Sequence, residues 1–171
     1  MTTQKITKNL KWDDIISPTL NPNEFLETYG EKVKKVYENY KPKSDILEKI
    51  KNLLKSKEEK LRIIALGADW CPDCSRNVPH MIKIAKDVKT EDIELKILYG
   101  IRTNALHKTR GTKWHEKRSP PEATDPRFDL KAIPTFYFFN KSGEYLGVIV
   151  ENPEYDSTIE EDIYKILKGN L

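Results

Sequence analysis

The feature that most constrains the fold is a pair of cysteines, Cys71 and Cys74, placed where an apolar run gives way to a helical pattern. The run Leu61–Leu66 is bounded by charged residues on one side and Gly67 on the other, which is typical of a buried strand. After the cysteines, apolar residues recur at helical spacing to about Val88. A buried strand followed directly by a helix predicts an α/β domain with the cysteine pair at the helix N-terminus.

The remaining pattern predicts a mixed sheet flanked by helices. Further strands are expected at Ile93–Tyr99, Thr135–Phe139 and Glu144–Val150, and helices from Pro22 to Pro42, from Ser44, and from a Ser157/Glu160 capping box to Gly169. The first two strands and their crossover helix form a right-handed parallel unit, and the last two form an antiparallel hairpin around Gly143. Residues 1–43 are expected to form a helical extension, with Trp12, Ile15 and Ile16 docking as an arm, and residues 44–171 the main domain.

Composition limits the classes of partner. The 171 residues suit one domain, and 30 basic against 27 acidic side chains give a net charge of +3, which is too small to indicate nucleic acid binding. The longest apolar runs have the length of core strands, so no membrane span is expected. The first residues lack the apolar stretch of a secretory signal. We therefore expect a cytoplasmic monomer that binds neither nucleic acid nor membrane.

The number and spacing of the cysteines favour redox chemistry. A disulfide scaffold needs more pairs at longer spacing, and a zinc site needs a second pair of ligands. The three histidines, His80, His107 and His115, are too scattered to complete such a site by spacing.

At a helix N-terminus, the free backbone N–H groups and the helix dipole stabilise a thiolate. Cys71 is therefore predicted to attack a disulfide, and Cys74, one turn further in, to resolve the mixed disulfide. Pro72 suits the first turn of the helix. The carboxylates of Asp73 and, more weakly, Asp69 should oppose thiolate formation.

These residues resemble the thioredoxin superfamily. The segment Trp70-Cys71-Pro72-Asp73-Cys74, followed by Pro79 and later by Ile133-Pro134-Thr135-Phe136, matches the family pattern over about residues 60–170. The resemblance implies a cis peptide bond before Pro134, a helix kink at Pro79, and a client-binding surface formed by Trp70, Ile133, Pro134 and Thr135. It also implies a thiol–disulfide oxidoreductase that acts on a disulfide-containing client protein and is regenerated by a separate reductase. The chain has no Gly-rich dinucleotide motif, so we expect it to bind no cofactor.

The sequence departs from the family pattern at three places. Ala65 stands where the family has a buried aspartate that assists the resolving thiol, and Gly67 stands where a tryptophan is usual. The connection before Pro134 is also longer than usual and carries basic residues around Trp114: Arg102, His107, Lys108, Arg110, Lys113, His115, Lys117 and Arg118. This insert is either a solvated basic loop or a docking surface for an acidic partner, with Trp114 as its anchor.

Two alternatives to a general reductase stay open. The missing acid and the basic insert suit a redox partner dedicated to one client. The cysteine pair could instead hold a metal or an iron–sulfur cluster across a dimer without catalytic turnover, with Cys71 supplying one ligand per chain.

Overall fold

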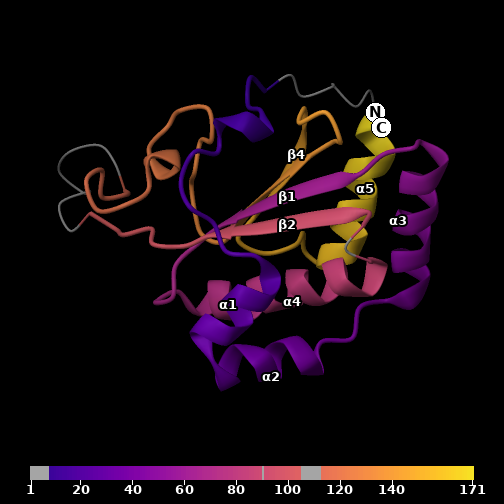
Figure 1. Ribbon diagram of the computed structural model, residues 1–171, viewed down its shortest axis with the longest axis horizontal. Helices are drawn as coiled ribbons and strands as arrows, with labels where there is room; N and C mark the ends of the chain where they lie inside the picture. Colours follow the sequence, from indigo (N-terminus) through magenta and orange to yellow (C-terminus); the bar gives the residue numbers. More distant parts are fainter. Residues whose placement is uncertain (1–7, 90, 105–112) are drawn as a thin grey trace.

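The computed structural model describes residues 8–89, 91–104 and 113–171. Within these residues a single sheet is formed by four strands: β1 (Leu61–Leu66), β2 (Ile93–Leu98), β3 (Thr135–Phe139) and β4 (Tyr145–Val150). The strand order is β2-β1-β3-β4, with β2 parallel to β1 and with β3 antiparallel to both β1 and β4 (Figure 1). The predicted parallel unit and antiparallel hairpin are thus confirmed, and β2 and β4 each differ from expectation by one residue at one end.

The helices are α1 (Pro22–Tyr29), α2 (Glu31–Asn39), α3 (Ser44–Ser56), α4 (Pro72–Val88) and α5 (Ile159–Asn170), with short 3-10 turns η1 (Trp12–Asp14) and η2 (Pro121–Ala123). The prediction of one helix from Pro22 to Pro42 was wrong, because Gly30 separates α1 from α2 with φ of 80°, a backbone conformation that favours glycine. The last helix also begins one residue later than predicted. Its N-cap is Thr158, whose hydroxyl accepts from Glu161 N, and it continues through Gly169.

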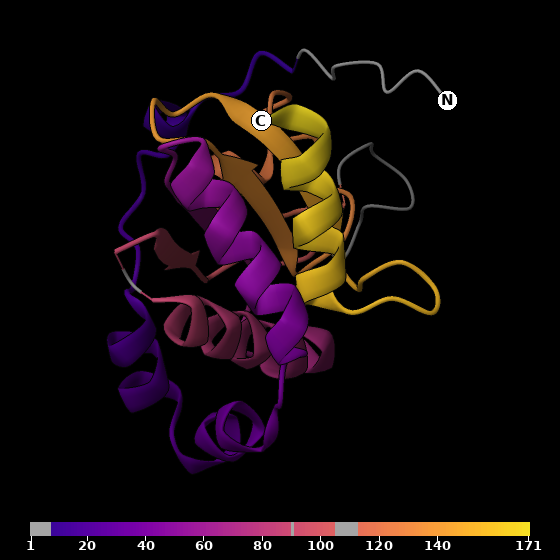
Figure 2. The ribbon, with the colours of Figure 1, turned by 90° about the vertical axis from the view of Figure 1, so that its right-hand side faces the viewer.

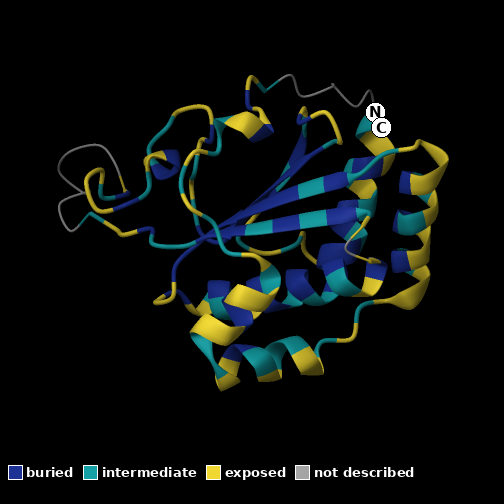
Figure 3. Ribbon diagram, in the orientation of Figure 1, coloured by how far each residue is buried: buried dark blue, intermediate teal, exposed yellow. Residues whose placement is uncertain are grey.

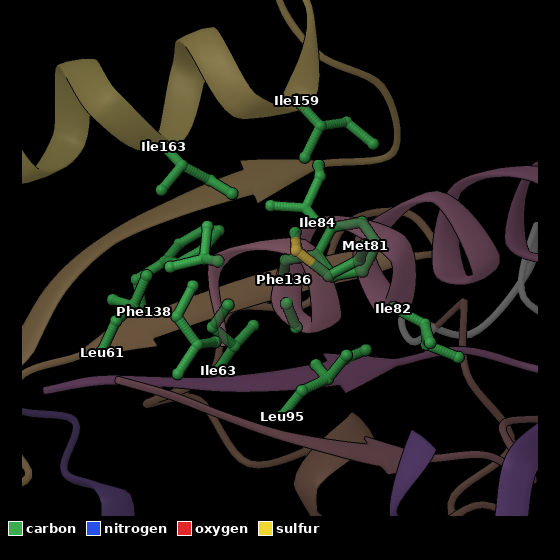
Figure 4. Packing of buried hydrophobic residues seen from close by; sticks show 14 of the residues in the cluster. Leu61, Ile63, Met81, Ile82, Ile84, Leu95, Phe136, Phe138, Ile159 and Ile163 are labelled. Atoms are coloured by element: carbon green, nitrogen blue, oxygen red, sulfur yellow. The ribbon is translucent and has the colours of Figure 1, made fainter. Parts of the chain in front are cut away.

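One face of the sheet carries the main hydrophobic core. Ile63 and Ala65 of β1 point into this face, and each of the helices α1 to α5 contributes side chains to it. Figure 4 shows part of this packing, with residues of α4 and α5 set against the strands. The helices α3 and α5 also lie side by side (Figure 2). The N-terminal helices therefore share one core with the sheet.

The other face of the sheet is covered by chain with little regular structure. Ile64 and Leu66 point into this second core, where they meet Trp12 of the N-terminal arm and Trp114 and Phe128 of the insert. Both faces of β1 are accordingly buried (Figure 3), which explains its continuous apolar sequence. The described part of the insert thus contributes Trp114 and Phe128 to this core, whereas its basic residues Arg102, Lys113, Lys117 and Arg118 are exposed.

The N-terminal arm docks through Trp12 and Ile15, two of the three residues expected to do so. Trp12 is buried and packs edge-on against Phe139, with ring centroids 5.5 Å apart. The backbone N–H of Trp12 donates to Gly143 O at 2.9 Å. Ile16 does not dock, because its side chain is 76% exposed.

A buried carboxylate joins the arm to the insert. Glu122 is 1% exposed, and its oxygens accept hydrogen bonds from Ile16 N at 3.0 Å, Ser17 N at 2.9 Å and Ser17 Oγ at 2.5 Å. Burial alone would raise the pKa of this carboxyl, but the bonds from Ser17 and Ile16 outweigh it, and the pKa lies below the usual value.

We expect Glu122→Gln to reduce the free energy of unfolding by about 1–3 kcal/mol at neutral pH, because an amide cannot accept all of these bonds. A carboxyl with a lowered folded pKa adds stability above its unfolded pKa, and this stability is lost as the pH falls through the folded value. The deficit of the variant should therefore shrink in acid. Urea titrations at neutral and acidic pH measure it, with Glu116→Gln, an exposed glutamate of the same insert, as the control. An equal deficit at both pH values would contradict this account.

Candidate functional site

The cysteine pair occupies the junction between β1 and α4. Cys71 is the N-cap of α4 and Pro72 its first residue, as predicted. The backbone N–H of Cys74 donates to Cys71 Sγ at 3.4 Å, so a helix-terminal donor points at the sulfur of Cys71. The first cysteine therefore sits where a thiolate gains from the helix N-terminus.

The two thiols differ in burial. Both are free cysteines, but Cys74 is fully buried, whereas Cys71 is 6% exposed. Burial raises the pKa of the Cys74 thiol, and its hydrogen bond with Cys71 raises it further. Cys74 is consequently a neutral thiol at neutral pH and is shielded from direct attack, as expected for a resolving cysteine.

The segment around Pro134 lies directly against Cys71. The Ile133–Pro134 peptide bond is cis, and the Cys71 thiol donates to Ile133 O at 3.5 Å. Pro134 O accepts from Glu151 N at 2.6 Å, and Thr135 Oγ1 donates to Ala132 O at 2.6 Å. The structure thus brings the two distant parts of the predicted site together, although 62 residues separate Cys71 from Ile133.

Trp70 is the exposed aromatic residue at this site. Its ring is 45% exposed, and its Nε1–H donates to Ile101 O at 2.9 Å, which ties the residue to the chain just after β2. Trp114, the expected anchor of the insert, is instead 4% exposed, and its Nε1–H donates to Leu130 O at 2.7 Å. The prediction of Trp114 as a docking anchor was therefore wrong, because its ring belongs to the second core. His107, Lys108 and Arg110 of the insert lie outside the described residues.

The negative charge of the Asp73 carboxylate is balanced by Arg76. Arg76 Nη2 donates to Asp73 Oδ1 at 2.5 Å and to Asn152 Oδ1 at 2.8 Å. A hydrogen bond with Asp73 also raises the pKa of Glu151. The i,i+3 spacing of Asp73 and Arg76 was a readable signal for this ion pair, but no local pattern indicated Glu151 or Asn152.

A buried amide holds this network to the helix. Asn77 is 3% exposed, and its Nδ2 donates to Glu151 O at 2.7 Å and to Asn152 Oδ1 at 3.0 Å. Glu151 accepts from Asn77 of α4 through its carbonyl oxygen and donates to Pro134 O through its backbone N–H. Glu151 therefore links α4 to the loop beside Cys71. Sequence reasoning had not assigned Asn77 a part in the site.

The remaining predicted residues lie at different depths. Asp69 is exposed, whereas Pro79 is buried inside α4. Ala65 is fully buried in β1, so the position of the family's aspartate holds a methyl group. Asp69, which lies at the surface, does not occupy that buried position.

Gly67 lines the space behind Cys74. A Cβ on this residue would lie 2.9 Å from Cys74 Sγ and 2.9 Å from Tyr99 Cε1. The Tyr99 ring is packed edge-on against Phe25 at 5.0 Å and tilted against Tyr29 at 5.1 Å between centroids. Cys74 therefore lies beside Tyr99, one ring of an aromatic cluster, with a glycine where the family usually has tryptophan.

Among the described parts of the chain, no three His, Cys, Asp or Glu side chains gather as a metal-binding group would. No helix of the described chain has the length and apolar character needed to cross a membrane.

Comparisons with known proteins agree with this fold. A protein of unknown function from Pseudomonas aeruginosa has a similar structure, with 18% identity, a TM-score of 0.56, and coverage of 95% of this chain and 93% of that one. An HIV epitope scaffold is similar with 20% identity, a TM-score of 0.53, and coverage of 94% and 89%. No curated protein matches the chain. The sequence model of the family described as thioredoxin matches residues 19–163, and this chain therefore belongs to the thioredoxin family.

Proposed function

We propose that the protein is a thiol–disulfide oxidoreductase that reduces protein disulfides through Cys71 and Cys74. One observation carries the proposal: a shielded Cys74 lies one helical turn behind Cys71, whose sulfur contacts the helix N-terminus and Ile133 O. Family membership supports redox chemistry of this general kind.

The proposed cycle has two exchange steps. The Cys71 thiolate attacks one sulfur of the client disulfide, which breaks the S–S bond and releases the other sulfur as a thiolate. Cys74 then gives its proton to water and attacks the Cys71 sulfur of the mixed disulfide. This breaks the bond to the client and releases the second client sulfur as a thiolate, which takes up a proton from water. The client gains two electrons, and the protein is left with a Cys71–Cys74 disulfide. A separate reductase returns two electrons to the protein.

The surroundings of Cys71 supply a surface for the client. We assign contacts with the incoming polypeptide to Trp70, which is half exposed, and to the backbone of the segment from Ile133 to Thr135. The side chains of Ile133 and Thr135 are themselves buried, so recognition there depends on the main chain. A reducing compartment such as the cytoplasm suits this direction of exchange.

We expect the purified protein to accelerate the reduction of insulin by dithiothreitol. The reduction potential of the Cys71–Cys74 couple, measured by equilibration with glutathione or thioredoxin, should lie nearer to ~−270 mV than to ~−120 mV. A potential near ~−120 mV would identify an oxidant and would overturn the proposal that the protein reduces its clients. Absence of any insulin reduction would overturn the proposal of a general reductase.

A further inference from the structure

A polar pocket opens beside Trp70. We call it the basic pocket. It has a volume of about 490 Å³ and is lined by Trp70, Arg102, Thr103, His115 and Arg118. Figure 1 shows the insert that forms it at the same end of the sheet as the N-terminus of α4. Trp70, which lines the basic pocket, directly precedes Cys71 in the chain.

Hydrogen bonds hold the walls of the basic pocket together. Ser119, which is 8% exposed, accepts from Arg102 N at 2.9 Å through its Oγ and donates from the same atom to Arg102 O at 3.1 Å. His115 N also donates to Arg102 O at 2.7 Å, and Arg118 N donates to His115 Nδ1 at 3.1 Å. The positions of both arginine backbones are therefore set by the fold.

The side chains of Arg102 and Arg118 are exposed, and in the part of the chain that the structure describes neither forms an ion pair. Acidic groups lie at other positions around the dithiol, with Asp73 and Glu151 beside α4 and an exposed Asp69 before Trp70. The Asp73 carboxylate is already paired with Arg76. The two unpaired guanidinium groups are thus available to a ligand carboxylate.

We propose that the basic pocket binds an acidic side chain of the client polypeptide next to the disulfide that Cys71 attacks. This proposal rests on the proposed function and specifies its substrate class. Guanidinium groups recognise carboxylates with defined geometry, and an opposite charge beside the scissile disulfide raises the rate of productive encounter. Polypeptides with lysine at the same place are disfavoured by the same charges.

The test uses three synthetic peptides, each closed by one disulfide and identical except for two residues beside one cysteine. These residues are glutamates, glutamines or lysines. At low ionic strength, kcat/KM should be about tenfold higher for the glutamate peptide than for the lysine peptide, and the ratio should approach one at high salt. The double variant Arg102→Glu/Arg118→Glu should invert the preference.

The matched control is Lys55→Glu/Lys57→Glu, which makes the same change of net charge on exposed residues at the C-terminal end of α3, at the opposite end of β1 from the dithiol. It should keep the wild-type preference. Equal rates with all three peptides would overturn the role of the basic pocket but leave the proposed function intact. Failure to reduce any peptide would contradict the proposed function itself. Faster reduction of oxidised glutathione than of the glutamate peptide would show that the occupant is not a polypeptide.

A second inference concerns the hydroxyl of Tyr99. This oxygen is buried and has no hydrogen-bond partner within the described residues. An ideal Cβ on Gly67 would lie 2.9 Å from Tyr99 Cε1 and 2.9 Å from Cys74 Sγ. The distance between these two atoms is therefore at most twice 2.9 Å. A buried hydroxyl without a partner is costly, and such groups often mark a functional site.

We infer that the Tyr99 hydroxyl donates a hydrogen bond to the Cys74 sulfur when this sulfur becomes a thiolate in the second exchange step. The Tyr99 hydroxyl thus assists the Cys74 thiol in place of the buried aspartate that the family has at the position of Ala65. Four other titratable groups face the pair: Tyr29 from α1, Asp69 before α4, and Cys71 and Asp73 at the N-terminus of α4. A backbone hydrogen bond from Ala68 also acts on the Cys74 thiol and lowers its pKa. Burial raises the pKa of Tyr99, so its hydroxyl stays protonated and able to donate.

The two exchange steps can be separated with the chromogenic disulfide dithiobis(nitrobenzoate). The first thiolate released reports attack by Cys71, and the second reports attack by Cys74 on the mixed disulfide. In Tyr99→Phe the second phase should slow about tenfold at neutral pH, and its pH midpoint should move upward, because the Cys74 thiolate has lost a donor. The first phase should keep its wild-type rate and pH profile.

The variant is expected to fold, since it removes a polar atom that lacks a partner, and its melting temperature should equal or exceed that of wild type. Tyr145→Phe, on the other face of the sheet, is the control and should change neither phase. A Tyr99→Phe protein whose second phase has the wild-type pH profile would overturn the inference. Equal slowing of both phases would also overturn it, because it would indicate a general distortion of the site.

Discussion

Cys71→Ser is expected to abolish disulfide reduction, whereas Cys74→Ser is expected to retain the first exchange step and lose the second. The difference follows from the structure, in which Cys71 is the partly accessible sulfur beside Ile133 and Cys74 is fully buried. Serine is almost isosteric with cysteine, so neither change creates a cavity large enough to unfold the domain. Insulin turnover should fall to the level of dithiothreitol alone in both variants.

Trapping distinguishes the two variants. Cys74→Ser should accumulate mixed disulfides with client proteins in a cell lysate, and Cys71→Ser should not. One dominant adduct would favour the reading of a dedicated redox partner, and a broad set of adducts would favour a general reductase. Full insulin reduction by Cys71→Ser would falsify the assignment of this residue as the attacking thiol.

The parts of the fold that could be predicted are those with a strong local pattern. The bounds of β1 and β3 agree with expectation because each is a short apolar run bounded by charged, proline or glycine residues. The start of α4 was also predictable, because Pro72 and the cysteine spacing both mark it. The break at Gly30 was missed because the apolar spacing continues on both sides of it.

The second core could not be predicted for a different reason. It is formed by single residues such as Trp12, Trp114 and Phe128, which lie in segments without periodicity. Glu122 is similar, because a lone glutamate looks like a surface residue until its partners at Ile16 and Ser17 are known. These contacts join segments about 100 residues apart, and no local rule finds them.

The same limit applies within the candidate site. The cysteine pair, Trp70 and the Ile133–Pro134 segment were identified from sequence, and the structure places them together. The partners that surround them, including Asn77, Tyr99 and Glu151, depend on how α4, β2 and β4 pack. Sequence therefore indicated the central residues of the candidate site, but not which groups surround them.

Gly67→Ala is expected to damage both folding and the second exchange step. The added methyl group would lie 2.9 Å from Cys74 Sγ and from Tyr99 Cε1, well inside the optimum of about 3.5–4.0 Å between carbon atoms. Cys74 is held in the first turns of α4, and the Tyr99 ring packs against both Phe25 and Tyr29, so neither neighbour moves easily. Overpacking of this kind costs about 1–3 kcal/mol of unfolding free energy.

A shift of Cys74 by a fraction of an ångström also misaligns it for attack on the mixed disulfide. We expect release of the second thiolate to slow by roughly 10- to 100-fold, because displacements of about 1 Å cost up to that factor. Gly169→Ala is the matched control: this exposed glycine lies in the last turn of α5 with nothing within 4 Å of an added Cβ, so alanine should preserve or raise stability. A Gly67→Ala protein with the stability and exchange rates of wild type would contradict this prediction. The close packing of Tyr99 against Cys74 would then not matter to the reaction. The absence of the family's tryptophan at this position would then need another cause.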